Sequence, residues 1–96
     1  VMMANHGGDH AIYPDCRPDF VKAFSSAAES GTYNRVTLLS PYTDMTKGEI
    51  AKRGKSLGVD YSKTWSCYAG GDKPCGKCGT CVERREALAE AGIDCD

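Results

Sequence analysis

Residues 67–81 read CYAGGDKPCGKCGTC, so four cysteines fall within fifteen positions of the chain. Their spacing is Cys-x7-Cys-x2-Cys-x2-Cys, and glycines and a proline lie between them. Thiolates this close in sequence can complete a tetrahedral metal site at little loop-closure cost, but are poorly spaced for disulfide pairing with one another. Four protein ligands fill the usual coordination shell of zinc, which indicates a structural site. The predicted zinc ligands are Cys67, Cys75, Cys78 and Cys81.

Two other interpretations of these cysteines stay open. Cys-x-x-Cys-x-x-Cys runs also hold iron–sulfur clusters, whose fourth ligand lies elsewhere in the chain. The cysteines are otherwise ordinary buried free thiols, although four such residues rarely gather in one glycine-rich loop. Two cysteines remain outside the cluster. Cys95 lies near the end of the sequence and is expected to be unimportant, whereas Cys16 precedes a predicted helix. There it is either a reactive thiol with a lowered pKa or a small packed residue.

Composition favours one small globular domain, or part of one. The chain has 96 residues, of which 41% are hydrophobic and 26% are charged. A formal net charge of -1 provides no overall attraction to nucleic acid or to an anionic membrane. The apolar run at residues 1–4 is far shorter than the roughly 20 residues of a membrane span. No signal peptide is visible, so a cytoplasmic, reducing location is expected.

The first part of the chain predicts a strand, a helix and a second strand. Residues 1–4 and 36–39 are short apolar runs typical of buried strands. Between them, Pro18 suits the first turn of a helix whose apolar residues recur at helical spacing, and Gly31 is a plausible end. This order has the length of a right-handed parallel crossover. The predicted fold class is therefore α/β with a parallel sheet.

Two further helices and a long loop are predicted after this unit. Thr46 and Glu49 have the form of a capping box, which indicates a helix that Gly58 ends. The side chains expected on its inner face are Ile50, Ala51, Gly54 and Leu57. Residues 61–79 lack periodicity and are expected to form a loop, and the last helix is expected at about residues 80–91.

Polar residues in the first part suggest a ligand loop. Tyr13, Asp15 and Arg17 are held between two prolines, after the first predicted strand, where open α/β sheets bind ligands. The alternative is that Asp15 only caps the helix and Arg17 is its surface partner. Lys47 lies in the first turn of the next helix, where it would suit a phosphate, or is a solvated surface lysine. His6 and His10 are expected to face solvent, with a metal or catalytic role as the alternative.

Several of these segments, taken together and in order, resemble the family of 7-cyano-7-deazaguanine synthases of queuosine precursor biosynthesis. The most specific parts are the string at residues 13–17 (YPDCR), the string at residues 64–68 (TWSCY) and the cysteine run with Arg84 behind it. Asp9 and the string at residues 46–50 (TKGEI) add to the likeness. The likeness covers nearly the whole chain, with departures at His6, Ala11, Ile12 and Leu88.

The resemblance implies an ATP-dependent ligase with the fold of the adenine nucleotide alpha hydrolase-like proteins. Such an enzyme converts 7-carboxy-7-deazaguanine and ammonia to the nitrile through adenylated intermediates, and uses ATP with Mg²⁺. The family's Ser-Gly-Gly-x-Asp-Ser phosphate loop does not occur in this sequence. The chain therefore resembles the carboxyl-terminal half of the enzyme and is expected to be inactive alone. Residues 1–62 would be a partial nucleotide-binding domain, and residues 63–96 a zinc-binding loop with the terminal helix.

The resemblance also suggests roles for single residues. Tyr13, Asp15 and Arg17 would bind the deazaguanine, Lys47 would lie near the ATP phosphates, and the four cysteines would bind structural zinc. No nucleic acid or membrane partner is implied, and a homodimer is allowed. The alternative function is a stand-alone structural zinc module that contacts protein or RNA. The basic residues near the cysteines give this alternative some support: Lys73, Lys77, Arg84 and Arg85.

Overall fold

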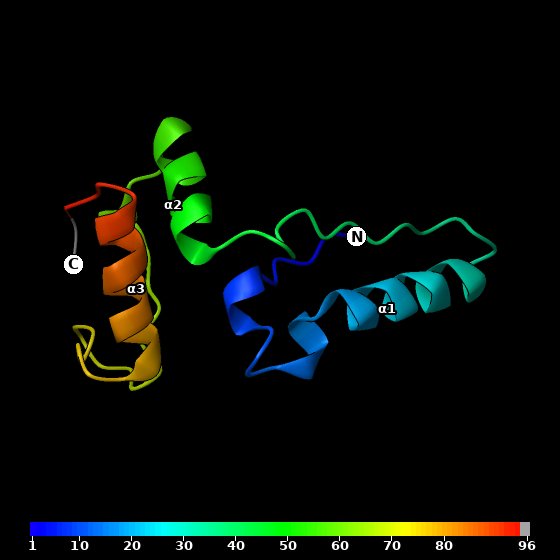
Figure 1. The fold of residues 1–96 in the computed structure, drawn as a ribbon, viewed down its shortest axis with the longest axis horizontal. Helices are drawn as coiled ribbons and strands as arrows, with labels where there is room; N and C mark the ends of the chain where they lie inside the picture. Colours follow the sequence, from blue (N-terminus) through cyan, green and yellow to red (C-terminus); the bar gives the residue numbers. More distant parts are fainter. Residues whose placement is uncertain (95–96) are drawn as a thin grey trace. The chain divides into compact units, whose positions relative to one another are not determined.

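The structure is a computed structural model, and it describes residues 1–94. The chain divides into two compact units, Val1–Thr46 and Lys47–Asp96 (Figure 1). This division follows contacts within the chain and does not address the predicted functional boundary after residue 62, which stays a prediction. Within residues 1–94, every helix is too short or too polar to cross a membrane.

The first unit contains helix α1, Pro18–Ser30. The predicted limits are confirmed, because Pro18 occupies the first turn and Gly31 follows the last helical residue. Phe20 and Phe24 stack one helical turn apart, with ring centroids 5.7 Å from each other. No residue of α1 is buried in the structure as described, so the predicted apolar face stays partly exposed.

The predicted strands are confirmed only as a parallel contact between two short segments. Met2 and Leu39 form an isolated parallel bridge, in which the Met3 amide donates to the Leu39 carbonyl and the Leu39 amide to the Val1 carbonyl. Residues 1–94 contain no extended strand, so the parallel sheet itself stays a prediction. The side chains of Met2 and Leu39 are more than half exposed. One bridge without a covering layer does not bury the apolar side chains that make a short sheet stable.

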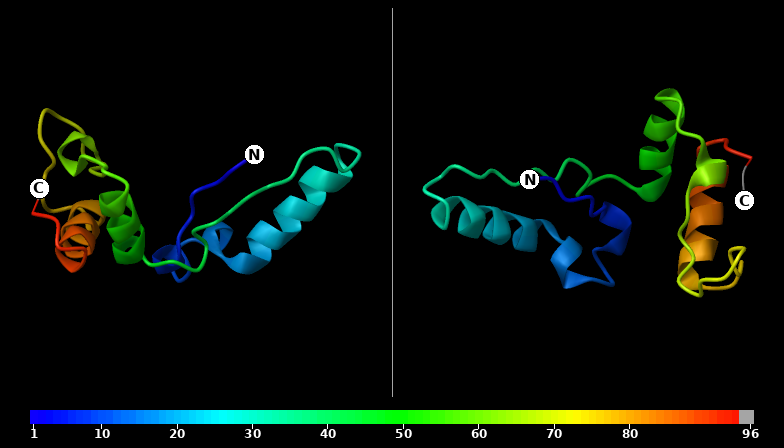
Figure 2. Two further views of the ribbon diagram at one scale, coloured as in Figure 1. Left: turned by 90° about the horizontal axis from the view of Figure 1, so that it is seen from above. Right: turned by 180° about the vertical axis from the view of Figure 1, so that it is seen from behind.

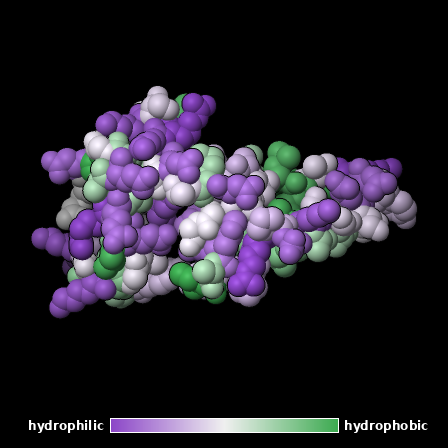
Figure 3. Space-filling view, in the orientation of Figure 1, coloured by the Kyte–Doolittle hydropathy of each residue, from purple (hydrophilic) through white to green (hydrophobic). Residues whose placement is uncertain are grey.

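The second unit is a pair of packed helices, α2 at Lys47–Ser56 and α3 at Gly79–Glu90. They lie side by side in two views (Figures 1 and 2). Their core contains Ala51, Leu88 and Ala91, against which Tyr61 and Ile93 pack. The observed α3 agrees with the predicted helix to within one residue at each end. Hydrophobic residues form small groups separated by hydrophilic ones on the face drawn in Figure 3.

The predicted inner face of α2 is only partly confirmed. Ala51 is buried, as expected, but Leu57 lies beyond the last helical residue and is 66% exposed. Gly54 has a specific reason to be glycine, because a Cβ there would collide with the Tyr61 hydroxyl. That hydroxyl donates a hydrogen bond of 3.0 Å to the Ala51 carbonyl, which holds the start of the long loop against α2.

Candidate metal centre

The four predicted cysteines are presented by the loop before α3 and by the start of that helix. Cys67 and Cys75 lie in irregular loop, Cys78 is the residue immediately before α3, and Cys81 lies in its first turn. Gly76 has φ of +72°, a left-handed conformation that glycine adopts without strain. The loop reverses there, and this turn brings Cys75 and Cys78 to the same side.

The sulfur atoms of these cysteines gather into one cluster. Each offers its Sγ within 4.8 Å of the others, and the pairs Cys75–Cys81 and Cys67–Cys78 are 4.0 Å apart. Zn–S bonds of about 2.3 Å in a tetrahedron place sulfur atoms about 3.8 Å from one another. A cluster of several iron atoms would hold them farther apart. The cysteines therefore fit one metal ion such as zinc.

Backbone amides surround the sulfur atoms and favour negative charge on them. The Cys67 sulfur accepts from the amides of Ala69 and Cys75, each at 3.3 Å. The Cys75 sulfur accepts from the amides of Lys77 at 3.4 Å and Cys78 at 3.3 Å. Amide–thiolate hydrogen bonds of this kind offset part of the charge of four thiolates around a divalent ion.

The pKa values of the thiols differ within the cluster. The hydrogen bond with the Thr80 hydroxyl, followed by bonds with backbone groups, lowers the pKa of Cys78 to about 5. The Cys75 amide is the main cause of a lowered pKa at Cys67. Desolvation raises the pKa of Cys81 to about 12, so this thiol needs the charge of a bound cation to ionise at neutral pH. All five cysteines within residues 1–94 are free thiols, which argues against a disulfide framework.

Thr80 is expected to support metal binding through Cys78. Its Oγ1 lies 3.1 Å from the Cys78 sulfur, where the hydroxyl can donate to a thiolate. We predict that Thr80→Val weakens zinc binding roughly tenfold, because the hydroxyl that donates to the Cys78 thiolate is lost. Thr80→Ser keeps the donor and should bind zinc as the unsubstituted protein does. Competition against a chelator of known affinity measures how tightly each variant binds zinc. Equal zinc affinities of the Val and Ser variants would contradict the role of the Thr80 hydroxyl.

Two arginines on α3 hold the loop that carries the cysteines. The Arg84 guanidinium donates to the Tyr61 carbonyl and to the Thr64 hydroxyl, both at 2.7 Å. Arg85 donates to the Gly76 carbonyl at 3.0 Å. In the sequence, both residues stand out only as part of a motif or of a basic group. Nothing in their spacing showed that their partners would be loop groups 9 to 23 residues earlier in the chain.

The polar loop of the first unit carries Tyr13, Asp15 and Arg17. All three are exposed, and Pro14–Cys16 between them form a 3-10 turn. The Arg17 Nε donates to the His10 carbonyl at 2.6 Å, and Arg17 itself precedes α1 without a side-chain cap. The alternative in which Asp15 caps the helix and pairs with Arg17 is therefore wrong. Their predicted substrate role stays a prediction.

One expectation about this loop needs correction, and the structure favours one of the two interpretations of Cys16. His6 is buried rather than solvent-facing, since its Nδ1 accepts from the Gly8 amide and its Nε2 lies 3.1 Å from the Asp9 carboxylate. Desolvation, and then the charges of Asp15 and Asp9, raise the pKa of Cys16. This opposes the reactive thiol and favours a packed residue. Cys95 lies outside the described residues.

Lys47 stands in the first turn of α2, as predicted. Its ammonium group forms an ion pair of 3.1 Å with the Glu83 carboxylate on α3, and both side chains are about one-third exposed. Lys47 is therefore a partly exposed lysine that is paired with a carboxylate of the neighbouring helix. A role near ATP phosphates stays a prediction.

Comparison with known proteins places this chain in a family. A family model described as "Queuosine biosynthesis protein QueC" matches residues 1–92. A "7-cyano-7-deazaguanine synthase" of Porphyromonas gingivalis is 60% identical over 93 residues, which are 97% of this chain and 42% of that protein. One from Methanoregula boonei is 58% identical over 89 residues, 93% of this chain and 41% of that protein. One from Rhizobium johnstonii is 53% identical over 95 residues, which are 97% of this chain and 40% of that protein.

The chain thus spans about two-fifths of the length of the curated relatives that it matches. No solved structure matches it. The family model nevertheless covers all but the last four of its 96 residues, and it includes the polar loop, Lys47 and the four cysteines. The chain belongs to the QueC family of queuosine biosynthesis proteins.

Proposed function

We propose that this chain is the carboxyl-terminal part of an ATP-dependent ligase that makes 7-cyano-7-deazaguanine from 7-carboxy-7-deazaguanine and ammonia. The observation that carries the proposal is the match of residues 1–92 to the family, with relatives of 53–60% identity that bear the synthase name. The enzyme would be cytoplasmic, and a homodimer is compatible with the proposal. This chain alone would be inactive, because the phosphate loop expected of the family is not in its sequence.

The proposed reaction has two activations. ATP first transfers AMP to the substrate carboxylate and releases pyrophosphate, and ammonia then displaces AMP to give the amide. A second ATP adenylates the amide oxygen and releases a second pyrophosphate, and loss of AMP and a proton then leaves the nitrile. Within this chain, Lys47 would lie near the ATP phosphates, and the ATP would be bound with Mg²⁺. Arg17 would suit the substrate carboxylate, and Asp15 the donor edge of the guanine-like ring.

The four cysteines would hold a zinc ion whose role is structural. Four thiolates leave no coordination position for water, so the metal would fold the loop and would not act as a Lewis acid. The gathered sulfur atoms and the amides that point at them support this assignment.

A hybrid protein tests the proposed function. In it, this chain replaces the matching 93 residues of the Porphyromonas gingivalis relative. We expect the hybrid to convert 7-carboxy-7-deazaguanine, ammonia and ATP to the nitrile, with two AMP formed per nitrile, as mass spectrometry and nucleotide chromatography can measure. A soluble, zinc-loaded hybrid that forms no nitrile would overturn the proposal.

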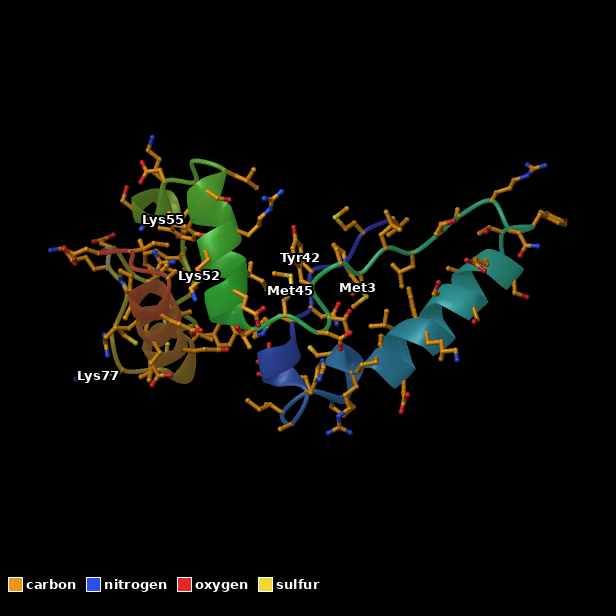
Figure 4. All side chains as sticks on the ribbon, turned by 45° about the horizontal axis from the view of Figure 1, so that its top comes forward. Met3, Tyr42, Met45, Lys52, Lys55 and Lys77 are labelled. Carbon is orange, nitrogen blue, oxygen red and sulfur yellow. The ribbon has the colours of Figure 1, made fainter. Side chains whose placement is uncertain are left out.

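The RNA-binding module is the weaker candidate. Arg84 and Arg85 donate hydrogen bonds to the loop carbonyls of Tyr61 and Gly76. Their guanidinium groups therefore do not form a free basic surface for RNA. The other basic side chains of the second unit are dispersed. Lys52 and Lys55 lie on α2, whereas Lys77 lies on the cysteine loop (Figure 4). The Lys55 ammonium donates to the Gly92 carbonyl at 3.1 Å.

A further inference from the structure

The four cysteines of the cluster differ in their access to solvent. Cys75 is exposed and Cys78 is half-buried, whereas Cys67 and Cys81 are only 6% and 5% exposed. Thiolate character and exposure together decide which of several thiols an oxidant attacks first. We propose that the cluster is a redox switch, in which a peroxide oxidises Cys75 and Cys81 to a disulfide and the metal is released. The inference rests on the proposed zinc site and is independent of the proposed reaction.

A cavity gives a small oxidant access to the second sulfur atom. It has a volume of about 390 Å³, and Cys81 lines it together with Lys73, Arg84 and Arg85. Lys73 and Arg85 are exposed, so the cavity opens at the surface of the second unit. A space that holds several water molecules also admits hydrogen peroxide. Cys81 is therefore buried in the fold and yet faces a space that a peroxide can enter.

The distance between the two sulfur atoms favours their pairing. The Sγ atoms of Cys75 and Cys81 lie 4.0 Å apart. A disulfide bond of about 2.05 Å requires them to approach each other once they no longer share a metal ion. Cys75 lies in irregular loop next to the turn at Gly76, so its backbone can move without breaking a helix. Cys67 and Cys78 are also 4.0 Å apart, but neither of them is exposed.

The proposed oxidation has two steps. The Cys75 thiolate attacks one oxygen of hydrogen peroxide, the O–O bond breaks, and hydroxide leaves as the sulfur becomes a sulfenic acid. The Cys81 thiolate then attacks this sulfur, a second hydroxide leaves, and the disulfide bond forms. The two sulfur atoms together lose two electrons, which reduce the peroxide to two hydroxide ions. The guanidinium groups of Arg84 and Arg85 at the cavity favour the departure of hydroxide.

Formation of the disulfide removes half of the metal ligands. Cys67 and Cys78 alone do not complete a tetrahedral zinc site, so the metal leaves and the loop loses the ion that folds it. The loss reaches Trp65, because its indole Nε1 donates a hydrogen bond of 2.8 Å to the Cys67 carbonyl. A thiol reductant converts the disulfide back to two thiols, so the change is reversible. The switch thereby couples the folding of this loop to oxidising conditions.

Treatment of the zinc-loaded hybrid protein with hydrogen peroxide tests the inference. A chromogenic chelator measures zinc release, and mass spectrometry of proteolytic peptides identifies the disulfides. We expect stoichiometric release of zinc, a bond between Cys75 and Cys81, and recovery of zinc binding after dithiothreitol and Zn²⁺ are added. A hybrid that keeps its zinc in peroxide would refute the switch. A bond that joins other cysteines in place of this pair would refute the proposed pairing.

The substitution Cys75→His separates metal binding from oxidation. A histidine nitrogen replaces one thiolate in Cys₃His zinc sites but cannot form a disulfide. We expect this variant to hold zinc and to release it in peroxide roughly tenfold more slowly, or slower still, than the unsubstituted hybrid. Release that is equally fast would rule out Cys75 as the first thiol to react. If the variant does not hold zinc, the disulfides identified in the unsubstituted hybrid decide the question.

Cys16→Ala serves as the control for the loss of a thiol. Cys16 is a partly buried free cysteine outside the cluster, so its substitution should leave the rate of zinc release unchanged. Slower release from this variant would show that Cys16 takes part and would contradict the assignment to Cys75 and Cys81. A hybrid that releases zinc as expected but makes no nitrile would overturn the proposed function and leave the switch standing.

Discussion

Removal of zinc with a strong chelator is expected to unfold residues 61–81. Binding of a structural zinc is worth roughly 10–16 kcal/mol in apparent free energy, as much as the whole stability of a typical domain. Within residues 61–81, only Cys67 and Cys81 are buried, and residues 68–78 form no helix or strand. The other contacts that hold these residues are a few hydrogen bonds, such as those from Arg84 and Arg85, and at about 1 kcal/mol each they do not offset the conformational entropy of the loop without the metal.

Amide hydrogen exchange measures this loss directly. Protection at the amides that face the sulfur atoms, such as those of Ala69 and Cys78, should disappear with the metal. Added Zn²⁺ should restore it, whereas Mg²⁺, which prefers oxygen ligands, should not. Native protection across residues 61–81 in protein shown by elemental analysis to hold no metal would refute the structural role.

Substitution of one cysteine of the cluster is expected to have the second large effect on folding. We predict that Cys78→Ala in the hybrid protein abolishes soluble expression and does not merely slow the reaction. The substitution removes one of four ligands, and Cys78 is also the residue from which α3 begins. Soluble yield and zinc content per chain are the measurements.

Cys16→Ala is the matched control for Cys78→Ala. Cys16 is a partly buried free thiol in the polar loop and does not belong to the sulfur cluster. Its substitution should leave soluble yield and zinc content unchanged. A Cys78→Ala protein that is soluble and well folded, but only slower, would show that the metal is not what holds the loop.

The helices were largely predictable because their signals are local. Pro18 and Gly31 mark the ends of α1, and Gly58, with φ of +83°, follows the end of α2. Each of these signals acts within one turn of its own position, so spacing along the chain is sufficient. The gathering of the sulfur atoms was predictable for a similar reason, since Cys75, Cys78 and Cys81 lie three residues apart.

The strands were less predictable because a strand needs a partner. The apolar runs at residues 1–4 and 36–39 indicated which segments would pair, and the structure pairs them in the expected direction. Whether a single bridge becomes a sheet depends on further neighbours and a covering layer, and neither is encoded in the runs themselves. The same limit applied to His6, whose burial depends on contacts made by the folded loop.

Sequence alone determined the family, the three helices and the cluster of four cysteines, because motifs, caps and short spacings act over a few neighbouring residues. Tertiary structure decided which side chains hold the loop that carries the cysteines. Arg84 reaches back twenty residues and more to hold Thr64 and Tyr61, and Lys47 on α2 pairs with Glu83 on α3. Such partners are brought together only when α2 and α3 pack, so no local pattern could reveal them.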